Sequence, residues 1–316
     1  WSQNMPAGGN NNAVRSPRSL YMNAPDISLG DNRWLAATDG SFDLGEMVTL
    51  DGARLDRKPA KKTLRRIVQR IATAQRMLYA QNKFAVLLVF QAMDAAGKDS
   101  TIRNVLSGVN PAGCQVWSFT RPSSLELDHD FLWRTTKRLP ERGRIGVFNR
   151  SQYEEVLVVR VHPGILDNQQ LPYPIDLETI WDDRLHSIRE QEAHLARNGT
   201  VVLKFFLNVS REEQRQRFLA RLSEPEKNWK FEPNDVRERR NWTEYMAAYQ
   251  SAIEATSKPW APWYCIPADD KRAMRIEVAK IVASTLERLP LAFPVTNAAD
   301  QATHDLMHAE LLAEED

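Results

Sequence analysis

One segment, residues 84–106, constrains the fold more than any other part of the chain. Residues 84–90 form a short run of large and β-branched apolar residues, which is typical of a strand buried on both faces. A Gly97-Lys98 pair follows after a few small residues, and apolar residues then recur with helical spacing up to Leu106. A strand, a tight loop with a lysine and a helix in this order present loop N–H groups and a helix N-terminus to an anion. The segment therefore predicts a phosphate-binding loop.

The loop departs from the usual pattern G-x-x-x-x-G-K-[ST] at two positions. Ala92 stands in place of the first glycine, and Asp99 stands in place of the hydroxyl residue that holds Mg²⁺. Asp94 lies inside the loop, where a carboxylate repels phosphate unless a metal intervenes. We interpret Asp94 as a Mg²⁺ anchor or as a group that orients the phosphoryl acceptor. The alternative is a turn aspartate that hydrogen-bonds its own backbone.

Strand-like and helix-like patterns alternate along the rest of the chain. Strands are predicted at 115–120, 144–148, 200–209 and 263–266, and helices at 132–139, 177–197 and 270–289. This alternation predicts a P-loop-type α/β fold, a three-layer α/β/α sandwich with a mostly five-stranded parallel sheet. We expect residues 1–50 to form a flexible N-terminal extension and a packed arm, 51–290 to form the P-loop domain, and 291–316 to form a C-terminal tail.

The loop after Phe90 and the loop after Phe148 are expected to meet at one edge of this sheet, where the carboxyl ends of the parallel strands lie. Ligands of open parallel sheets bind at this edge. Lys98 follows the first strand and is the predicted phosphate-binding lysine. Asn149 ends the strand at 144–148, where an acidic metal ligand is common, and its side chain can supply one uncharged metal or water contact. Arg150 is suited to clamp phosphate, or alternatively to pair with a nearby acid.

A basic run lies between Arg54 and Arg76, where nine Lys or Arg residues stand against one acid, Asp56. Apolar residues from Leu64 to Leu78 form a stripe on the same predicted helix, so one face packs and the other is strongly positive. The near absence of acids removes the usual i,i+4 ion pairs. Two interpretations stay open: a solvated face, and a surface that faces a polyanion.

The charged stretch at about 211–245 predicts helices, interrupted by Pro225 and Pro233, and is a candidate lid. Arg217 and Arg221 are spaced i,i+4, and Lys227 and Lys230 flank Trp229. Acids nearly balance the bases in this stretch, so its charge alone does not distinguish a solvated helix from a lid that closes over phosphate.

Composition excludes several classes of protein. The chain has 316 residues, 42% hydrophobic residues and a formal net charge of +1, which argues against a general nucleic-acid binder. No apolar segment reaches the roughly 18 residues of a membrane span, the N-terminus lacks a signal-sequence pattern, and the two cysteines lack partner spacing. We therefore expect a cytoplasmic protein that binds neither nucleic acid nor membrane.

Five strings in unbroken order resemble the polyphosphate kinase 2 family. They are residues 90–102, 148–163, 204–214 (Lys-Phe-Phe-Leu with Ser-Arg-Glu-Glu-Gln), 227–231 and 261–269. The resemblance runs from about residue 55 to 289, which makes it more specific than the loop alone. It implies a thymidylate-kinase-like P-loop fold with a helical lid, and transfer of the terminal phosphoryl group of inorganic polyphosphate to a nucleotide, or the reverse, with Mg²⁺ or with Mn²⁺ in its place.

The resemblance also implies roles for individual residues. Asp94 and Lys98 match the family's Walker A aspartate and lysine, Asn149 and Arg150 match its Walker B position, and Asp94 and Asn149 would be the metal ligands. The expected phosphate-binding residues are Ala96, Gly97, Lys98, Asp99, Ser100, Thr101 and Arg103, with Lys61, Lys62 and Arg65 in a basic groove for the polyphosphate chain. The expected lid residues are Arg217, Arg221, Lys227 and Lys230, and Arg121 and Glu154 are candidates for nucleotide contacts.

Asparagine at position 149, followed by Glu154-Glu155, resembles the branch of the family that accepts both AMP and ADP. A neutral amide repels an extra acceptor phosphate less than a carboxylate does. The resemblance further implies a homo-oligomer, a dimer or a tetramer. Two other classes of function remain: an ATP-dependent kinase of a nucleotide or small metabolite on the same fold, and a non-catalytic protein that binds nucleotide or polyphosphate.

Overall fold

A single parallel sheet forms the centre of the computed structural model, which describes residues 32–229 and 232–314. Its strands are β1 (Ala85–Gln91), β2 (Cys114–Ser118), β3 (Ile145–Asn149), β4 (Thr200–Asn208) and β5 (Trp263–Pro267). Their order is β2-β3-β1-β4-β5, and every neighbouring pair is parallel. The central strand β1 is buried at every residue, as its continuous apolar run predicts. The predicted five-stranded parallel sheet is confirmed.

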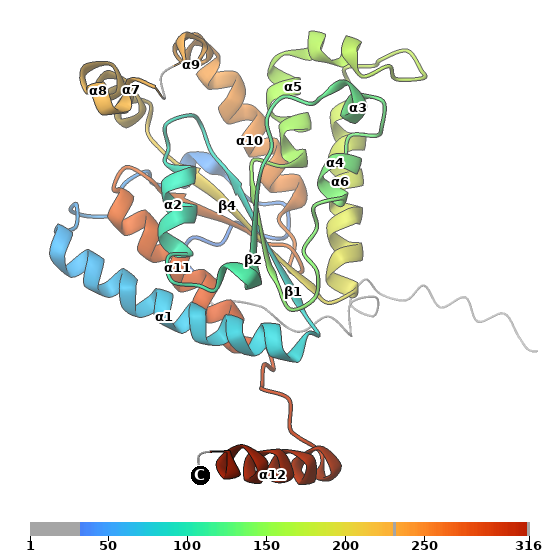
Figure 1. Cartoon of the computed structure of the whole chain (residues 1–316). Helices are drawn as coiled ribbons and strands as arrows, with labels where there is room; N and C mark the ends of the chain where they lie inside the picture. Colours follow the sequence, from blue (N-terminus) through green and yellow to red (C-terminus); the bar gives the residue numbers. More distant parts are fainter. Residues whose placement is uncertain (1–31, 230–231, 315–316) are drawn as a thin grey trace, which may run out of the picture.

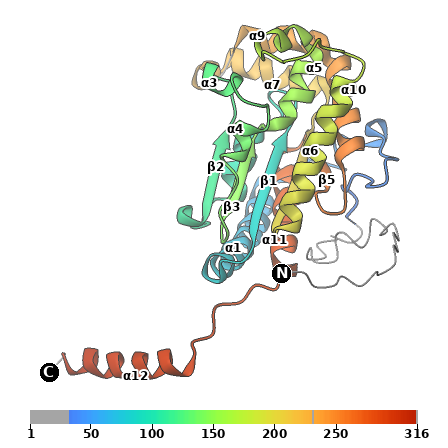
Figure 2. The ribbon, with the colours of Figure 1, turned by 90° about the vertical axis from the view of Figure 1, so that its right-hand side faces the viewer.

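Helices cover both faces of the sheet (Figures 1 and 2). One layer holds α1 (Arg57–Gln81), α2 (Lys98–Val105) and α11 (Lys271–Arg288), and the other holds α5 (Val158–Val161), α6 (Ile180–Arg197) and α10 (Trp242–Thr256). The apolar stripe of α1 is buried, with Ile71 and Leu78 fully inaccessible, and it packs against α11. The predicted three-layer α/β/α architecture is therefore confirmed.

Two predicted helices are shorter than expected. The helix predicted at 132–139 is only α4 (Trp133–Thr136), because the hydroxyls of Thr135 and Thr136 both donate to Leu132 O (2.9 Å each) and Pro140 follows. The helix predicted from residue 177 begins at Ile180, since Asp176 accepts from Glu178 N (2.9 Å) and holds a turn there.

The remaining elements are short or lie at the carboxyl edge of the sheet. They are α3 (Ser124–Leu127), α7 (Arg211–Ser223), α8 (Pro225–Asn228), α9 (Pro233–Glu238), η2 (Leu44–Glu46), η3 (Pro111–Gly113), η4 (Gln152–Val156), η5 (Pro163–Asn168) and η6 (Arg239–Asn241). Helices α7, α8 and α9 stand at the end of the molecule toward which β1 runs (Figure 1). They occupy the place predicted for a lid.

Two segments flank the sandwich. Trp34 and Leu35 run along β5, where Cys265 N donates to Trp34 O (2.8 Å) and Leu35 forms an antiparallel bridge with Tyr264. At the other end of the chain, residues 290–297 lead to α12 (Ala298–Ala313), which stands away from the sandwich in Figures 1 and 2 and buries none of its residues. No helix in the described part of the chain combines the length and apolarity that a membrane crossing needs.

Candidate active site

The loop between β1 and α2 has two residues with positive φ. Ala95 has φ 60° and Gly97, the N-cap of α2, has φ 112°. Side chains disfavour this region, so glycine is required at 97 for conformational reasons, and the non-glycine at 95 marks local strain of a kind common at functional sites. The backbone of Ala92 has no positive φ. The missing first glycine of the pattern therefore carries no conformational cost in this loop.

Lys98 lies across this loop. It is partly buried, and its Nζ donates to Ala92 O (2.9 Å). Burial and the nearby Arg150 lower the pKa of Lys98, while Asp94 and Glu154 oppose that shift. Lys98 is thus part of one charged cluster with Asp94, Arg150 and Glu154 at the carboxyl end of β1.

Asp94 and Arg150 form an ion pair across the loops that follow β1 and β3, with Arg150 Nη2 3.2 Å from Asp94 Oδ1. The backbone brings them together: Phe90 pairs with Asn149 in the sheet, and Arg150 N donates to Phe90 O (3.1 Å) at φ 63°. Burial opposes the charge of Arg150, yet Glu154 and Asp94 raise its pKa. The predicted ion pair of Arg150 with an acid is therefore present. The Arg150 side chain also lines a cavity of about 970 Å³, and its role as a phosphate clamp stays a prediction.

Asn149 and Asp99 explain each other's presence. Asn149 Nδ2 donates to Asp99 Oδ1 (2.7 Å) and to Ser118 Oγ (3.2 Å). A carboxylate at position 149 would face the Asp99 carboxylate with no hydrogen atom available for a hydrogen bond, whereas the Asn149 amide donates an N–H. The unusual residues Asp99 and Asn149 therefore form one hydrogen-bonded pair, which leaves Asn149 Oδ1 as the single oxygen of this side chain for a metal or water.

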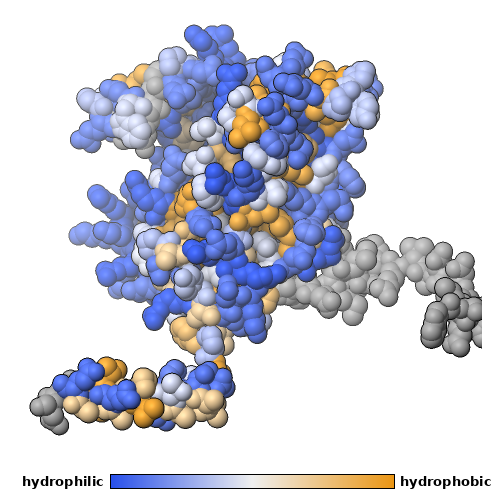
Figure 3. All heavy atoms as spheres, turned by 45° about the vertical axis from the view of Figure 1, so that its right-hand side comes forward, coloured by the Kyte–Doolittle hydropathy of each residue, from blue (hydrophilic) through white to orange (hydrophobic). Residues whose placement is uncertain are grey.

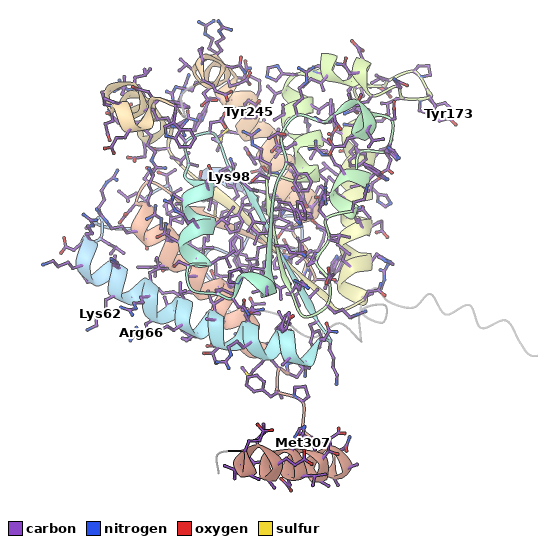
Figure 4. The ribbon with its side chains drawn as sticks, viewed as in Figure 1. Lys62, Arg66, Lys98, Tyr173, Tyr245 and Met307 are labelled. Carbon is purple, nitrogen blue, oxygen red and sulfur yellow. The ribbon has the colours of Figure 1, made fainter. Side chains whose placement is uncertain are left out.

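A cavity of about 970 Å³ opens over these residues. Its basic lining residues are Lys98, Arg103, Arg121, Arg150, Arg217, Arg221 and Lys271, and its acidic ones are Asp94, Asp99, Glu226 and Glu232. A second cavity of about 220 Å³ shares Asp94 and Arg150 with it and is lined by Glu154, Tyr245 and Tyr249. In the view of Figure 4, Tyr245 lies above Lys98, toward the lid helices. The charge of the larger cavity suits an anion.

The structure brings most of the predicted phosphate-binding residues together. Ala96, Gly97, Asp99, Ser100 and Arg103 line the larger cavity with Lys98. Thr101 does not, because it is fully buried and its hydroxyl donates to Gly97 O (3.0 Å). The two nucleotide candidates are separated, since Arg121 lines the larger cavity and Glu154 the smaller one.

The basic residues of α1 are placed elsewhere. Lys61, Lys62 and Arg65 line neither cavity, and Figure 4 shows Lys62 on the outer side of α1, pointing away from Lys98. The buried stripe of α1 faces α11, so its charged residues are turned outward. The groove through Lys61, Lys62 and Arg65 therefore stays a prediction outside these two cavities, whereas Arg103 lines the larger one.

Two of the predicted lid residues have different surroundings. The guanidinium of Arg217 donates to Ala96 O (2.7 Å), Ala268 O (2.6 Å) and Glu213 Oε1 (2.9 Å), with longer bonds to Ala95 O and Asp269 O. Arg217 therefore holds the loop from behind. Arg221 lines the cavity and donates to Asp235 Oδ2 (3.1 Å). Lys230 lies outside the described residues, as does the side chain of Lys227.

The sequence analysis missed three residues of this site. Lys271, at the start of α11, lines the larger cavity; its position just after the fifth strand is the signal that could have found it. Gln214 Nε2 donates to Asp94 O (2.9 Å), and Asp235 lines the smaller cavity. Neither of these two has a sequence signal, because both reach the loop from the lid segment.

Asp235 is expected to give the protein a pH-dependent stability. Burial, and then the Asp94 carboxylate, raise the pKa of Asp235 from 3.8 to about 6. Its contribution to the free energy of unfolding is therefore complete below the unfolded-state pKa and is lost as the pH rises through about 6. We expect the melting temperature of Asp235→Asn, which stays uncharged, to fall less than that of the wild type between mildly acidic and mildly alkaline pH. Thermal melts over this range, with Asp305→Asn on α12 as the control, measure it; parallel curves for Asp235→Asn and wild type would contradict the assignment.

Asp94 is suited to a magnesium ion. Its carboxylate is partly exposed, at 30% of its side-chain surface, and it borders both cavities. No group of three or more His, Cys, Asp or Glu residues within 32–229 and 232–314 is arranged to hold a metal. Magnesium commonly binds through one or two carboxylates together with substrate phosphates and waters, so one carboxylate beside a mostly basic cavity fits that ion.

Comparison with known proteins assigns the chain to a protein family. The sequence profile of the polyphosphate kinase 2 family matches residues 54–290, a range that contains the sheet, the loop and the lid helices. The chain belongs to the polyphosphate kinase 2 family. The departures at Ala92, Asp99 and Asn149 therefore occur within a member of the polyphosphate kinase 2 family.

Named relatives and a solved structure of the polyphosphate kinase 2 family agree with this assignment. The chain is 52% identical to the ADP-polyphosphate phosphotransferase of Rhodopseudomonas palustris, over 85% of this chain and 94% of that protein. It is 42% identical to the AMP/ADP-polyphosphate phosphotransferase of Meiothermus ruber, over 83% and 95%. The crystal structure of polyphosphate kinase 2 from Arthrobacter aurescens superposes with a TM-score of 0.76 at 33% identity, covering 86% of this chain and 98% of that one.

Proposed function

We propose that the protein transfers the terminal phosphoryl group of inorganic polyphosphate to AMP, to ADP or to both, and that the reaction is reversible. The observation that carries this proposal is the grouping of Lys98, Asp94 and Arg150 in a basic cavity of a polyphosphate kinase 2 family member. The names of relatives at 52% and 42% identity include ADP and AMP/ADP as acceptors, which supports nucleotides as the acceptor class.

The side chains of the site suit transfer between two phosphates. Lys98 and Arg150 border the cavity from two loops, so they are placed to neutralise charge on a transferring phosphoryl group, and the N-terminus of α2 adds its dipole. The acceptor is an ionised phosphate, so the reaction requires no strong general base. Magnesium, held by Asp94 with Asn149 Oδ1 as the second candidate ligand, would supply further charge neutralisation when bound; Mn²⁺ is the expected substitute.

Two parallel incubations distinguish the three classes of function, and the second contains ATP in place of polyphosphate as the donor. In the first, the protein is mixed with Mg²⁺, long-chain polyphosphate and either AMP or ADP, without ATP. Formation of ADP or ATP is the expected result. Transfer that occurs only from ATP would identify an ordinary kinase of the same fold, and turnover with neither donor would identify a binding protein.

Arg103 and Lys271 are expected to contact the polyphosphate chain, because both line the larger cavity on the side of α2 and α11. The double substitution Arg103→Ala/Lys271→Ala should raise the KM for polyphosphate roughly tenfold while changing the KM for nucleotide less, since each removes a charged contact. Steady-state kinetics with each substrate varied in turn measure both constants.

The matched control for Arg103→Ala/Lys271→Ala is Lys61→Ala/Lys62→Ala. It also removes two positive charges, but from α1, outside both cavities. It should leave the KM for polyphosphate within about twofold of wild type. An equal rise in both double variants would show that polyphosphate runs along α1 instead.

A further inference from the structure

The peptide between Asp94 and Ala95 has a fixed orientation in the loop that follows β1. Its carbonyl oxygen, Asp94 O, accepts a hydrogen bond from Gln214 Nε2 on α7 (2.9 Å). The described residues contain no cis peptide bond, so the C=O and the N–H of this peptide point in opposite directions. The N–H of Ala95 is therefore directed away from the Gln214 amide, at a residue that lines the larger cavity.

Ala95 is strained in this orientation. Its φ of 60° is one that residues with a Cβ rarely adopt. A flip of the Asp94–Ala95 peptide would give Ala95 an ordinary negative φ, but it would exchange the positions of the C=O and the N–H. A loop binds phosphate through its N–H groups, and a carbonyl oxygen in the same place repels phosphate. The hydrogen bond from Gln214 opposes the flip, because the flipped Asp94 O would point away from its donor.

The peptide between Ala96 and Gly97 has the same arrangement without the strain. Ala96 O accepts a hydrogen bond from Arg217 Nη1, also on α7 (2.7 Å), and Gly97 has φ 112°. Glycine adopts positive φ readily, so this peptide gains little from a flip. Gln214 therefore holds the peptide that has the stronger tendency to turn over.

Gln214 depends on another side chain for its own orientation. The face of the molecule in Figure 3 is mostly hydrophilic, and solvent satisfies exposed polar groups of that kind. Gln214, in contrast, is only 1% exposed, and its Oε1 accepts a hydrogen bond from Arg239 Nη1 (2.5 Å). A guanidinium group only donates hydrogen bonds, so Arg239 selects the oxygen of the Gln214 amide and leaves Nε2 directed at Asp94 O.

Arg239 belongs to η6, the short helix between α9 and α10. Its Nη1 also donates to Arg211 O (3.0 Å), at the start of α7. Two hydrogen bonds thus join η6 to the first turn of α7. The position of η6 and the orientation of the Asp94–Ala95 peptide are therefore connected through one side chain, that of Gln214.

We propose that Gln214 is a positioning residue for phosphoryl transfer: it keeps the Ala95 N–H available to a phosphate in the cavity, and Arg239 keeps Gln214 in the orientation that does so. This inference rests on the proposed function, which supplies the phosphate. The loop then has its phosphate-binding form only while η6 lies against α7.

Two substitutions at position 214 test the hydrogen bond to Asp94 O. Gln214→Glu keeps the shape of the side chain but, ionised beside Arg239, lacks the donor; Gln214→Met lacks both polar groups and adds no charge. Each should lower kcat about 100-fold and raise the Kd for inorganic tripolyphosphate with Mg²⁺ about tenfold. The KM for nucleotide should stay within about twofold of wild type. Steady-state kinetics and isothermal titration calorimetry measure these constants, and a loss confined to Gln214→Glu would show an effect of charge and overturn the proposal.

Arg239→Met tests the second hydrogen bond. It should lower kcat less, by about tenfold. The double variant Gln214→Met/Arg239→Met should be no slower than Gln214→Met alone, since Arg239 acts through Gln214. Effects that multiply in the double variant would show that Arg239 acts on the substrate directly, which would overturn its assigned role.

The matched control is Gln216→Glu, the same change on the exposed side of α7. Its side chain donates to Glu212 Oε1 (2.7 Å) and lines neither cavity, so kcat and the Kd for tripolyphosphate should stay within about twofold of wild type. Circular dichroism establishes that each variant is folded. If Gln214→Met does not fold, Gln214→Glu and Arg239→Met still decide the proposal.

A crystal structure of a folded position-214 variant gives a readout that does not depend on turnover. The expected result is a negative φ at Ala95, and a retained positive φ there would overturn the proposal. A wild type that binds tripolyphosphate but transfers no phosphoryl group would refute the proposed function alone. Wild-type turnover that neither position-214 variant reduces would refute this inference alone.

Discussion

Asp94→Asn is expected to lower kcat about 1,000-fold while the fold remains intact. The substitution removes the negative charge that faces Arg150 and the carboxylate suited to magnesium, both at the centre of the cluster around Lys98. The side chains of the pair are 30% and 42% exposed, and an ion pair of this exposure contributes less than about 1 kcal/mol to stability. For a domain of this size, that corresponds to a change in melting temperature of less than about 4 °C.

Thermal melts and steady-state kinetics of the same preparation separate these two effects. Asp128→Asn, on the turn that follows α3, is a control of the same chemistry that lies in neither cavity. Turnover of Asp94→Asn at the wild-type rate would exclude the role assigned to Asp94. A large fall in melting temperature would show instead that Asp94 is mainly structural.

Arg217→Met should destabilise the protein strongly, by roughly 3–5 kcal/mol, and inactivate it. The side chain of Arg217 is 7% exposed, and its loss removes the donor to Ala96 O and Ala268 O and leaves the Glu213 carboxylate with Arg54 alone. Unpaired buried acceptors of this kind are among the costliest changes in a folded protein. A fall in melting temperature on the order of 10 °C is expected.

The paired variant is Arg221→Met, one helical turn away on α7 and more exposed, at 22% of its side-chain surface. It should keep a melting temperature close to that of the wild type and raise the KM for polyphosphate, because Arg221 lines the cavity. If both variants lost activity at unchanged stability, the two arginines would share a substrate-binding role in the lid.

The fold was largely predictable because its signals are local. The uninterrupted apolar run at 84–90 indicates a strand buried on both faces, and the alternation of such runs with helical patterns indicates a parallel sheet covered on two sides. The lengths of the helices beginning near 132 and 177 were less accurate, since Thr135, Thr136 and Asp176 compete for backbone groups that the apolar spacing does not report.

The topology of the sheet predicted those site residues that adjoin a strand. Lys98, Asn149 and Arg150 were found because the carboxyl ends of parallel strands meet at one edge. Lys271 follows the same rule and was missed, since a single lysine after a strand is a weak signal. Gln214 and Asp235 approach from the lid, which no local pattern connects to the loop.

The sequence by itself determined that residues 84–106 form a strand, a tight loop with Lys98 and a helix, because burial and backbone conformation depend on neighbouring residues. The tertiary structure alone decided how the charged side chains are used. Arg217 and Arg221 look equivalent at i,i+4 and both line the cavity, yet Arg217 donates to backbone carbonyls of the loop and of the segment just after β5, whereas Arg221 donates to Asp235. Lys62 lies in a basic run, yet the packing of α1 on α11 turns it away from the site. Long charged side chains take their role from the acceptors opposite them in space, which sequence spacing does not specify.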